Sequence, residues 1–265
     1  MSDPVVILGL GFTTQRLARR LRQRGRSVSA LVRNPDRFAE LAALGVGFSP
    51  DQLPKDAVLV HSVPPLADPE RSALRASIRD LSPRRVLYIS STGVYGAQTH
   101  VSEETPPAPN DDKGCARIDE EEWLSRLPSS VLILRSAAIY GPGRGIHVRL
   151  REGRLQSGAA RGAGGMVSRI QVDDLAAILE TGVDASIEGA WPVADEHPAP
   201  SDEVVAWCAN RMRLAMPDAL AFGSPVAGRS VNGRKIVELM GVKLKYPSYK
   251  EGIEASLVEE RPNRK

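Results

Sequence analysis

The sequence predicts an α/β fold, a doubly wound parallel sheet followed by a small C-terminal lobe. One observation is the buried strand Val5–Leu8, which runs through a glycine turn into a helix starting near Thr13. Another is the alternation of short apolar runs with helical periodicity, which is typical of parallel sheets covered by helices. We expect residues 1–145 to form the sheet domain, with 170–195 returning to it. Residues 146–169 and 196–265 should form the smaller, substrate-side lobe.

The composition is that of a globular protein. Of 265 residues, 42% are hydrophobic and 25% are charged. No apolar run is as long as a transmembrane helix and the N-terminus has no signal core, so we expect a cytoplasmic protein. Two cysteines and four scattered histidines predict neither disulfides nor a metal site. A net charge of +3 without a concentrated basic face does not indicate a nucleic-acid or membrane partner.

The glycine turn after the first strand is the candidate phosphate site of a Rossmann-type domain. In G-x-G-x-x-G loops, backbone N–H groups and the positive end of the next helix bind a pyrophosphate. Here Thr14 replaces the third glycine, where helix and strand should pack closely. An ordinary strand-to-helix turn is the alternative, but the N-terminal position favours a dinucleotide. We therefore assign Gly9, Gly11, Phe12, Thr13 and Thr14 to cofactor binding.

The tip of the second predicted strand, Val28–Val32, indicates the type of cofactor. NAD sites usually carry an acidic residue there, which binds the ribose hydroxyls. This chain has Arg33 at the same place, and a guanidinium can form paired hydrogen bonds with a 2′-phosphate. The sequence therefore favours NADP(H) over NAD(H). The alternative is that Arg33 and Arg37 are solvated loop charges.

The other elements follow from apolar runs and capping residues. We expect further strands at Val46–Phe48, Ala57–His61, Arg85–Ile89, Val131–Leu134 and Gly189–Val193. Helices are expected at Asn34–Leu44, Asp68–Leu81 and Lys113–Leu124, after Asp173 and Ser201, and finally at about Asn232–Met240. Ser62 and Val63 follow a strand end, where such sheets bind ligands, so we add both to the cofactor site.

Five sequence blocks occur in a characteristic order along nearly the whole chain. They are Tyr88–Gly96 (YISSTGVYG), Glu103–Pro106, Leu134–Gly143, Arg169–Asp174 and Val193–Pro198. Together they resemble the extended short-chain dehydrogenase/reductase superfamily, the NAD(P)-dependent epimerase/dehydratase group. The resemblance implies a nicotinamide cofactor and a catalytic set of Ser/Thr, Tyr and Lys.

Only the first member of that catalytic set is present. By resemblance Ser91 takes the Ser/Thr position, where its hydroxyl would bond a substrate oxygen. Lys113 stands where the tyrosine belongs and Arg117 where the lysine belongs, so the chain resembles an atypical member. Lys113 can donate a proton only if burial lowers its pKa. Arg117 can bind ribose hydroxyls or phosphate but does not titrate usefully.

Basic residues are concentrated in the segment after the Val131–Leu134 strand. They are Arg144, His147, Arg149, Arg151, Arg154, Arg161 and Arg169. In related enzymes this region faces the substrate, so the resemblance implies that Arg144 and Arg169, with Thr92, bind a phosphate or carboxylate. A solvated helix face is an equally good interpretation of the cluster.

Three functions remain open. The first is an NADP(H)-linked oxidoreductase or epimerase for a small anionic or sugar-like substrate, with altered proton-transfer groups. The second is a non-catalytic NADP(H)-binding redox sensor or assembly factor, which the absent tyrosine favours. The third is another enzyme class on the same fold, with a purely structural nucleotide.

A homodimer is also expected from the resemblance, because related proteins often pair through the helices here at Asp68–Leu81 and Lys113–Leu124. Ala73, Leu74 and Ile78 would form its apolar seam, or they would face this chain's own core.

Overall fold

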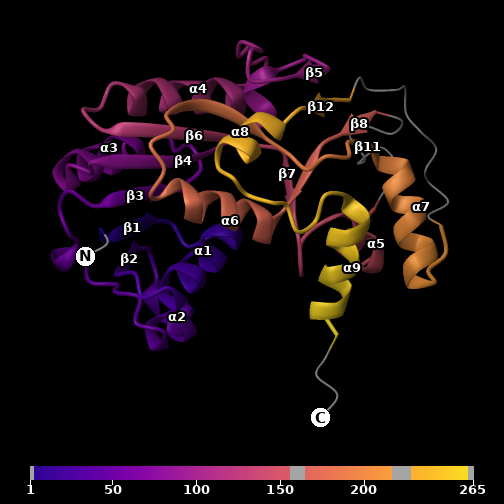
Figure 1. Ribbon diagram of the computed structural model, residues 1–265, viewed down its shortest axis with the longest axis horizontal. Coiled ribbons are helices and arrows are strands. Elements are labelled where there is room, and N and C mark those ends of the chain that lie inside the picture. Colours follow the sequence, from indigo (N-terminus) through magenta and orange to yellow (C-terminus); the bar gives the residue numbers. More distant parts are fainter. Residues whose placement is uncertain (1–2, 156–164, 217–227, 262–265) are drawn as a thin grey trace.

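The computed structural model describes residues 3–155, 165–216 and 228–261. Its centre is a sheet of six parallel strands in the order β10-β6-β4-β3-β1-β2 (Figure 1). These strands are β1 (Val5–Leu8), β2 (Val28–Leu31), β3 (Val58–His61), β4 (Arg85–Ser91), β6 (Ser130–Ser136) and β10 (Gly189–Val193). The chain order reverses between β1 and β3, and sheets of this type bind ligands at that switch point.

Helices cover both faces of the sheet, as the sequence predicts. One face carries α1 (Phe12–Gln23), α2 (Ala39–Ala43), α6 (Val172–Gly182) and α8 (Arg234–Leu239), and the other α3 (Glu70–Leu81) and α4 (Asp112–Ser125). Strand β1 shows why its four apolar residues are all needed. Its odd-numbered residues pack into the α1–α6 core and its even-numbered residues into the α3–α4 core. The uninterrupted apolar run is therefore the signature of a strand covered on both faces.

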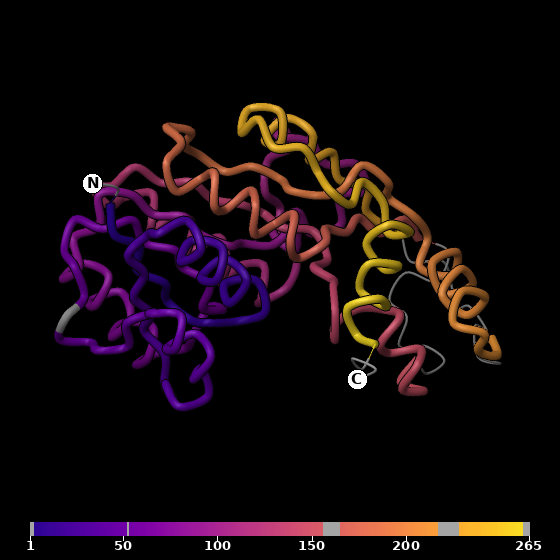
Figure 2. Tube along the Cα trace, turned by 60° about the horizontal axis from the view of Figure 1, so that its bottom comes forward, coloured from indigo at the N-terminus to yellow at the C-terminus, as the bar shows by residue number. Residues whose placement is uncertain are grey.

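A smaller lobe lies beyond one end of the sheet (Figure 2). Its helices are α5 (Ile146–Arg151), α7 (Ser201–Met212) and α9 (Tyr249–Glu259), which share one apolar core. Two-stranded pairs flank it: β7 (Ala138–Tyr140) with β9 (Arg169–Gln171), β8 (Met166–Val167) with β11 (Ala199–Pro200), and β5 (His100–Val101) with β12 (Ser230–Val231). Among the described residues, no helix has the length and apolar character needed to cross a membrane.

Three expected elements differ from the structure. The run Val46–Phe48 forms only one bridge, from Gly47 to Ser29 on β2, because the turn at Gly45 (φ +84°) leaves too few residues for a strand. The helix expected at Asn34–Leu44 divides into a 3₁₀ turn at Pro35–Phe38, capped by the Asn34 side chain, and the short α2. The helix near Asn232 is not the last one, since α9 follows it.

Candidate functional site

The glycine loop is held between three strand tips. Gly9 has φ +83°, a conformation that disfavours other residues, and its N–H donates to the carbonyl of Leu31 on β2 at 3.1 Å. A Cβ on Gly9 would lie 3.2 Å from Ser62 Oγ and 3.2 Å from a methyl group of Val63. The loop therefore fits closely against the residues that follow β3, and this close approach requires a glycine.

The Thr14 side chain stabilises the glycine loop through hydrogen bonds. Its fully buried hydroxyl accepts a hydrogen bond from Gly11 N–H at 2.9 Å and donates to the Gly9 carbonyl at 2.8 Å. The Ser62 hydroxyl donates to the same Gly9 carbonyl at 2.8 Å. The threonine in the third glycine position thus replaces close helix–strand contact with hydrogen bonds that fix the turn.

The start of α1 has the features that a dinucleotide phosphate requires. Within the described residues, the amides of Phe12, Thr13 and Thr14 have no hydrogen-bond acceptor, as expected for the first turn of a helix. A Cβ on Gly11 would meet no protein atom within 4 Å, so the space in front of this residue is open. The first turn carries no acidic side chain that would compete for the site. The loop therefore fits a nicotinamide dinucleotide.

Arg33 is exposed and lies two residues beyond the end of β2. Leu31, the last residue of that strand, accepts the hydrogen bond from Gly9, so the strand tip and the glycine loop are neighbours. Within the described residues, no hydrogen bond or ion pair engages the Arg33 side chain. It is thus available to a ligand that extends from the loop across β2.

Of the residues in the predicted catalytic positions, Ser91 lies at the tip of β4, and Lys113 and Arg117 lie on α4. Ser91 caps the 3₁₀ turn Thr92–Tyr95, with its hydroxyl accepting from Gly93 N–H at 3.1 Å. Arg117 reaches β4 from α4, where Nη1 donates to the Ile89 carbonyl at 3.3 Å. Lys113 lies exposed on the first turn of α4, and its side chain makes no hydrogen bond within the described residues. The structure thus brings Arg117 to the strand but leaves Lys113 in solvent.

Arg117 also contacts the hydroxyl of Tyr88, a buried residue. Its Nη1 lies 3.4 Å from the hydroxyl of Tyr88, a residue with no exposed surface. Burial raises the pKa of Tyr88 to about 12, although the charge of Arg117 opposes this shift. Tyr88 is therefore a neutral hydroxyl at physiological pH, and it helps to orient Arg117.

Arg229 supports the same strand tip, and no motif or spacing in the sequence points to it. Its guanidinium donates to the carbonyls of Thr92 at 2.5 Å and Gln98 at 3.1 Å, and also to that of Gly96. These three carbonyls lie in the turn that follows Ser91. Because Arg229 is more than 130 residues away in sequence, only the folded chain reveals this contact.

The predicted basic cluster separates into two groups. A cleft of about 390 Å³ between β7 and α5 is lined by Arg144, Arg149, Arg154 and Arg169. His147 and Arg151 instead contact Glu260, which belongs to the end of α9. Arg161 lies outside the described residues.

Arg169 is the most buried arginine of the cleft, with 6% of its surface exposed. It donates to the carbonyls of Val167 at 2.8 Å and Ala199 at 3.0 Å, and burial lowers its pKa. Much of its hydrogen-bonding capacity is therefore used to join β8 and β11. Arg144 and Arg149, by contrast, make no side-chain ion pair within the described residues.

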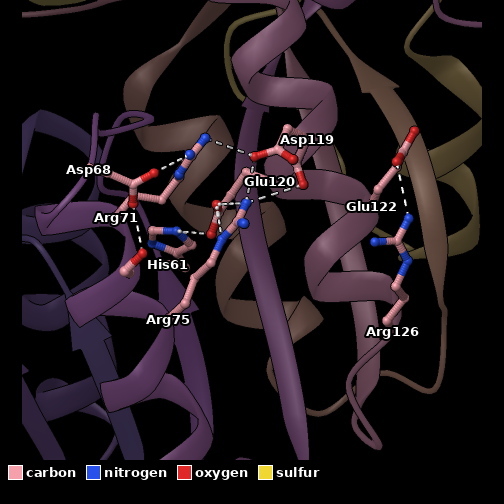
Figure 3. Close-up of polar contacts among 9 residues, drawn as sticks. His61, Asp68, Arg71, Arg75, Asp119, Glu120, Glu122 and Arg126 are labelled. Atoms are coloured by element: carbon pink, nitrogen blue, oxygen red, sulfur yellow. Dashed lines mark hydrogen bonds and ion pairs between the residues drawn. The ribbon is translucent and has the colours of Figure 1, made fainter.

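His61 ends β3 next to the predicted cofactor residues, yet it is almost fully buried. Its Nε2 lies 3.4 Å from Glu120, and its ring stacks on Tyr88 at 4.9 Å. Arg75 pairs with Glu120 at 2.8 Å and with Asp119 at 2.7 Å, which extends the network to the surface (Figure 3). These contacts make His61 a packed strand residue that connects β3 to α3 and α4.

Two relatives of known sequence are similar to this chain. Protein YeeZ of Escherichia coli K12 is 31% identical over 169 residues, which cover 62% of this chain. The match spans 59% of the length of YeeZ. A 3-diazoavenalumate denitrifying reductase of Streptomyces sp. is 25% identical over 88% of this chain and 93% of its own length. No protein-family model matches the chain.

Solved structures extend the similarity over the whole chain. A conserved protein of unknown function from Silicibacter pomeroyi is 30% identical, with a TM-score of 0.80 over 97% of this chain and 99% of its own. A proposed NAD-dependent epimerase/dehydratase from Methylobacillus flagellatus is 27% identical, with a TM-score of 0.78 over 99% of this chain and 100% of its own. These similarities place the chain in the short-chain dehydrogenase/reductase-like superfamily, with NAD-dependent epimerase/dehydratase-type proteins among its structural neighbours.

Proposed function

We propose that this protein binds a nicotinamide dinucleotide and prefers NADP(H) to NAD(H). The observation that carries the proposal is the first turn of α1 at the switch point of the sheet, where the amides of Phe12 and Thr13 have no acceptor among residues 3–155, 165–216 and 228–261. The resemblance to a proposed NAD-dependent epimerase/dehydratase supports the cofactor class. Arg33, exposed beyond β2, supports the preference for a 2′-phosphate.

The activity supported best is that of an oxidoreductase or epimerase-like enzyme acting on a small anionic or sugar-like substrate. A bound nicotinamide would supply or accept a hydride. Ser91 would donate a hydrogen bond to a substrate oxygen, and Arg117 would hold ribose hydroxyls. The arginines of the cleft, Arg149 and Arg154 among them, would attract a phosphate or carboxylate. The similarity to a reductase supports the redox chemistry.

A second function, a non-catalytic NADP(H) sensor or assembly factor, is favoured by one observation. By resemblance Lys113 occupies the position of the catalytic tyrosine, and in the described part of the chain its side chain is exposed and makes no hydrogen bond. The two functions differ in hydride exchange. If NADPH binds tightly but no carbonyl compound in a broad screen oxidises it, the sensor is favoured. Turnover with any carbonyl compound favours the enzyme.

Calorimetric titration tests the cofactor preference. We expect wild-type protein to bind NADP⁺ more tightly than NAD⁺. The Arg33→Gln variant should lose roughly ten- to a hundredfold in NADP⁺ affinity, since a hydrogen bond to a charged group is removed, with little change for NAD⁺. The Arg37→Gln variant is the control for the loss of one nearby positive charge. Equal or tighter binding of NAD⁺ by wild type would remove Arg33 from its assigned role.

A further inference from the structure

Arg144 belongs to the lobe but contacts the helix that follows the glycine loop. Its guanidinium carbon lies 5.3 Å from the centre of the Phe12 ring, and Phe12 is the first residue of α1. Such an arrangement is a cation–π contact, which fixes the charge over the ring face. Arg144 therefore carries a positive charge from the lobe to the start of α1, where the proposed function puts the cofactor phosphates.

The backbone of the turn from Gly141 to Arg144 also packs against the start of α1. Gly141 and Arg144 exchange backbone hydrogen bonds of 2.8 and 3.0 Å, which close a tight turn. A Cβ on Gly141 would lie 3.2 Å from the Phe12 ring and 2.5 Å from a methyl group of Val172 on α6. The approach of this turn to α1 thus requires a glycine, and it brings the backbone of the turn that carries Arg144 close to Phe12.

Arg144 is exposed and has no anionic partner of its own in the described part of the chain. Arg16 also lies over the Phe12 ring, at 6.0 Å, but it pairs with Asp173 at 2.8 Å and Glu259 at 2.9 Å. Arg144 makes no ion pair within the described residues, and the first turn of α1 has no acid. Its guanidinium is therefore free to donate to an anion bound at the positive end of α1, where both the helix dipole and the arginine favour negative charge.

We propose that Arg144 is a ligand of the dinucleotide diphosphate, supplied to the sheet domain by the lobe. The inference rests on the proposed function and changes the role that sequence resemblance implies for this residue. The planar guanidinium can donate to phosphate oxygens while one face remains stacked on Phe12. Because Arg144 also lines the arginine cleft, the same side chain joins the cofactor site to the site proposed for the substrate.

Two arginines then have separable effects on binding. The diphosphate is common to NADP⁺ and NAD⁺, whereas only NADP⁺ has a 2′-phosphate. In calorimetric titrations, Arg144→Gln should weaken both nucleotides by a similar factor, roughly tenfold or more. Arg33→Gln should weaken NADP⁺ alone. The Arg19→Gln variant, which removes an exposed charge from a later turn of α1, is the matched control and should bind both nucleotides as wild type does.

ADP serves as the probe for the adenosine and diphosphate part of the cofactor without the nicotinamide riboside. Arg144→Gln should weaken ADP as much as NAD⁺, and Arg144→Lys, which keeps the charge but not the planar contact, should lie between wild type and Arg144→Gln. Wild-type thermal stability in each variant shows that folding is intact. If wild type binds both nucleotides and Arg144→Gln binds them equally well, the inference is overturned while the proposed function stands. If wild type binds neither, the proposed function fails first.

Discussion

At the scale of single residues, Asp195 is the most perturbed carboxyl near the lobe. It is 3% exposed, one oxygen accepts from His197 N–H at 3.3 Å, and the other has no partner within the described residues. Burial raises its pKa from 3.8 to about 8, against the opposing effects of that hydrogen bond and of the charge of Arg169. Asp195 is thus protonated in the folded protein at pH values where the unfolded chain is ionised.

This shift predicts a loss of stability with rising pH. Between 3.8 and about 8 the folded state binds one proton more than the unfolded state, so the free energy of unfolding falls as the pH rises. Asp195→Asn removes the titrating group, and we expect it to be more stable than wild type at pH 8, with a smaller difference at pH 5. Urea denaturation at both pH values measures this. The control is Glu196→Gln, at the exposed neighbouring residue. Because it keeps Asp195, its difference in stability from wild type should be the same at pH 5 and pH 8.

At the scale of elements, a network of ion pairs joins β3, α3 and α4 (Figure 3). Its inner member is Glu120, which is 4% exposed and contacts His61 and Arg75. Burial alone would raise the pKa of Glu120, but the hydrogen bonds from His61 and Arg75 outweigh it, and the pKa lies below its ordinary value of 4.5. The network therefore stabilises the fold only while Glu120 is ionised.

Lowering the pH should weaken the ion-pair network around Glu120. Because the folded pKa of Glu120 is depressed, its contribution to stability is present above 4.5 and is lost as the pH falls through the folded value. Glu120→Gln should cost about 1–3 kcal/mol at pH 7, since half-buried Arg75 loses one of its two charged partners and keeps only Asp119. Its stability should also change less than that of wild type between pH 6 and 3. Glu122→Gln, which breaks only an exposed pair with Arg126, should be nearly neutral by the same denaturation measurement.

The same helices bear on the homodimer expected from the sequence. Ile78 has no exposed surface and Leu74 packs against the same core, so these residues face this chain's own sheet and only Ala73 is exposed. The outer side of α3 and α4 carries paired charges instead, with Arg71 bonded to both Asp68 and Asp119. Pairing of two copies through these helices remains a proposal, and its contact would be polar and sensitive to salt.

The sequence predicts the parts of the fold that depend on local pattern. The run Val5–Leu8 and the glycine turn identify the first strand and helix, because a strand covered on both faces must be apolar throughout. Helix α9 was missed for a physical reason. Gly252 interrupts its pattern like a helix breaker, but a Cβ there would lie 2.0 Å from the Tyr140 hydroxyl, so the glycine is required by a contact 112 positions away in sequence.

In the candidate site, too, local sequence patterns predict some residues and miss others. The loop residues could be predicted because the G-x-G pattern has a local mechanism, and Arg117 because the family motif fixes its place on a helix. Thr14 was read as an obstacle, since its hydrogen bonds to Gly9 and Gly11 depend on rotamers that a sequence does not display. Arg229 was not anticipated at all, because no local pattern marks an arginine that binds three distant carbonyls.

At the scale of the whole molecule, the end of α9 connects the lobe to the sheet domain. Glu259 pairs with Arg16 on α1 at 2.9 Å. Glu260 accepts from Gly143 N–H at 2.6 Å, lies 3.2 Å from His147 Nε2, and pairs with Arg151. Two successive residues thus hold α1 on one side and the turn of Arg144 with α5 on the other.

Loss of Glu260 should therefore loosen the joint between the two sites without unfolding the sheet. Burial alone would raise its pKa, but the hydrogen bonds from Gly143 and Arg151 lower it, so Glu260 is ionised at neutral pH and Glu260→Gln removes a charge from three contacts. We expect faster hydrogen exchange in residues 141–151, at least several-fold, and unchanged protection in β1 and β4.

The matched control is another carboxylate of α9. Glu254 pairs with Arg211 on α7, so Glu254→Gln breaks a contact inside the lobe and leaves the joint intact. It should leave exchange in residues 141–151 unchanged. The Glu260→Gln variant should also bind NADP⁺ more weakly than wild type, because Arg144 would be held less firmly over Phe12. Unchanged exchange in this turn would mean that the contacts of the turn with Phe12 and Val172 alone position Arg144, and that α9 does not link cofactor and substrate sites.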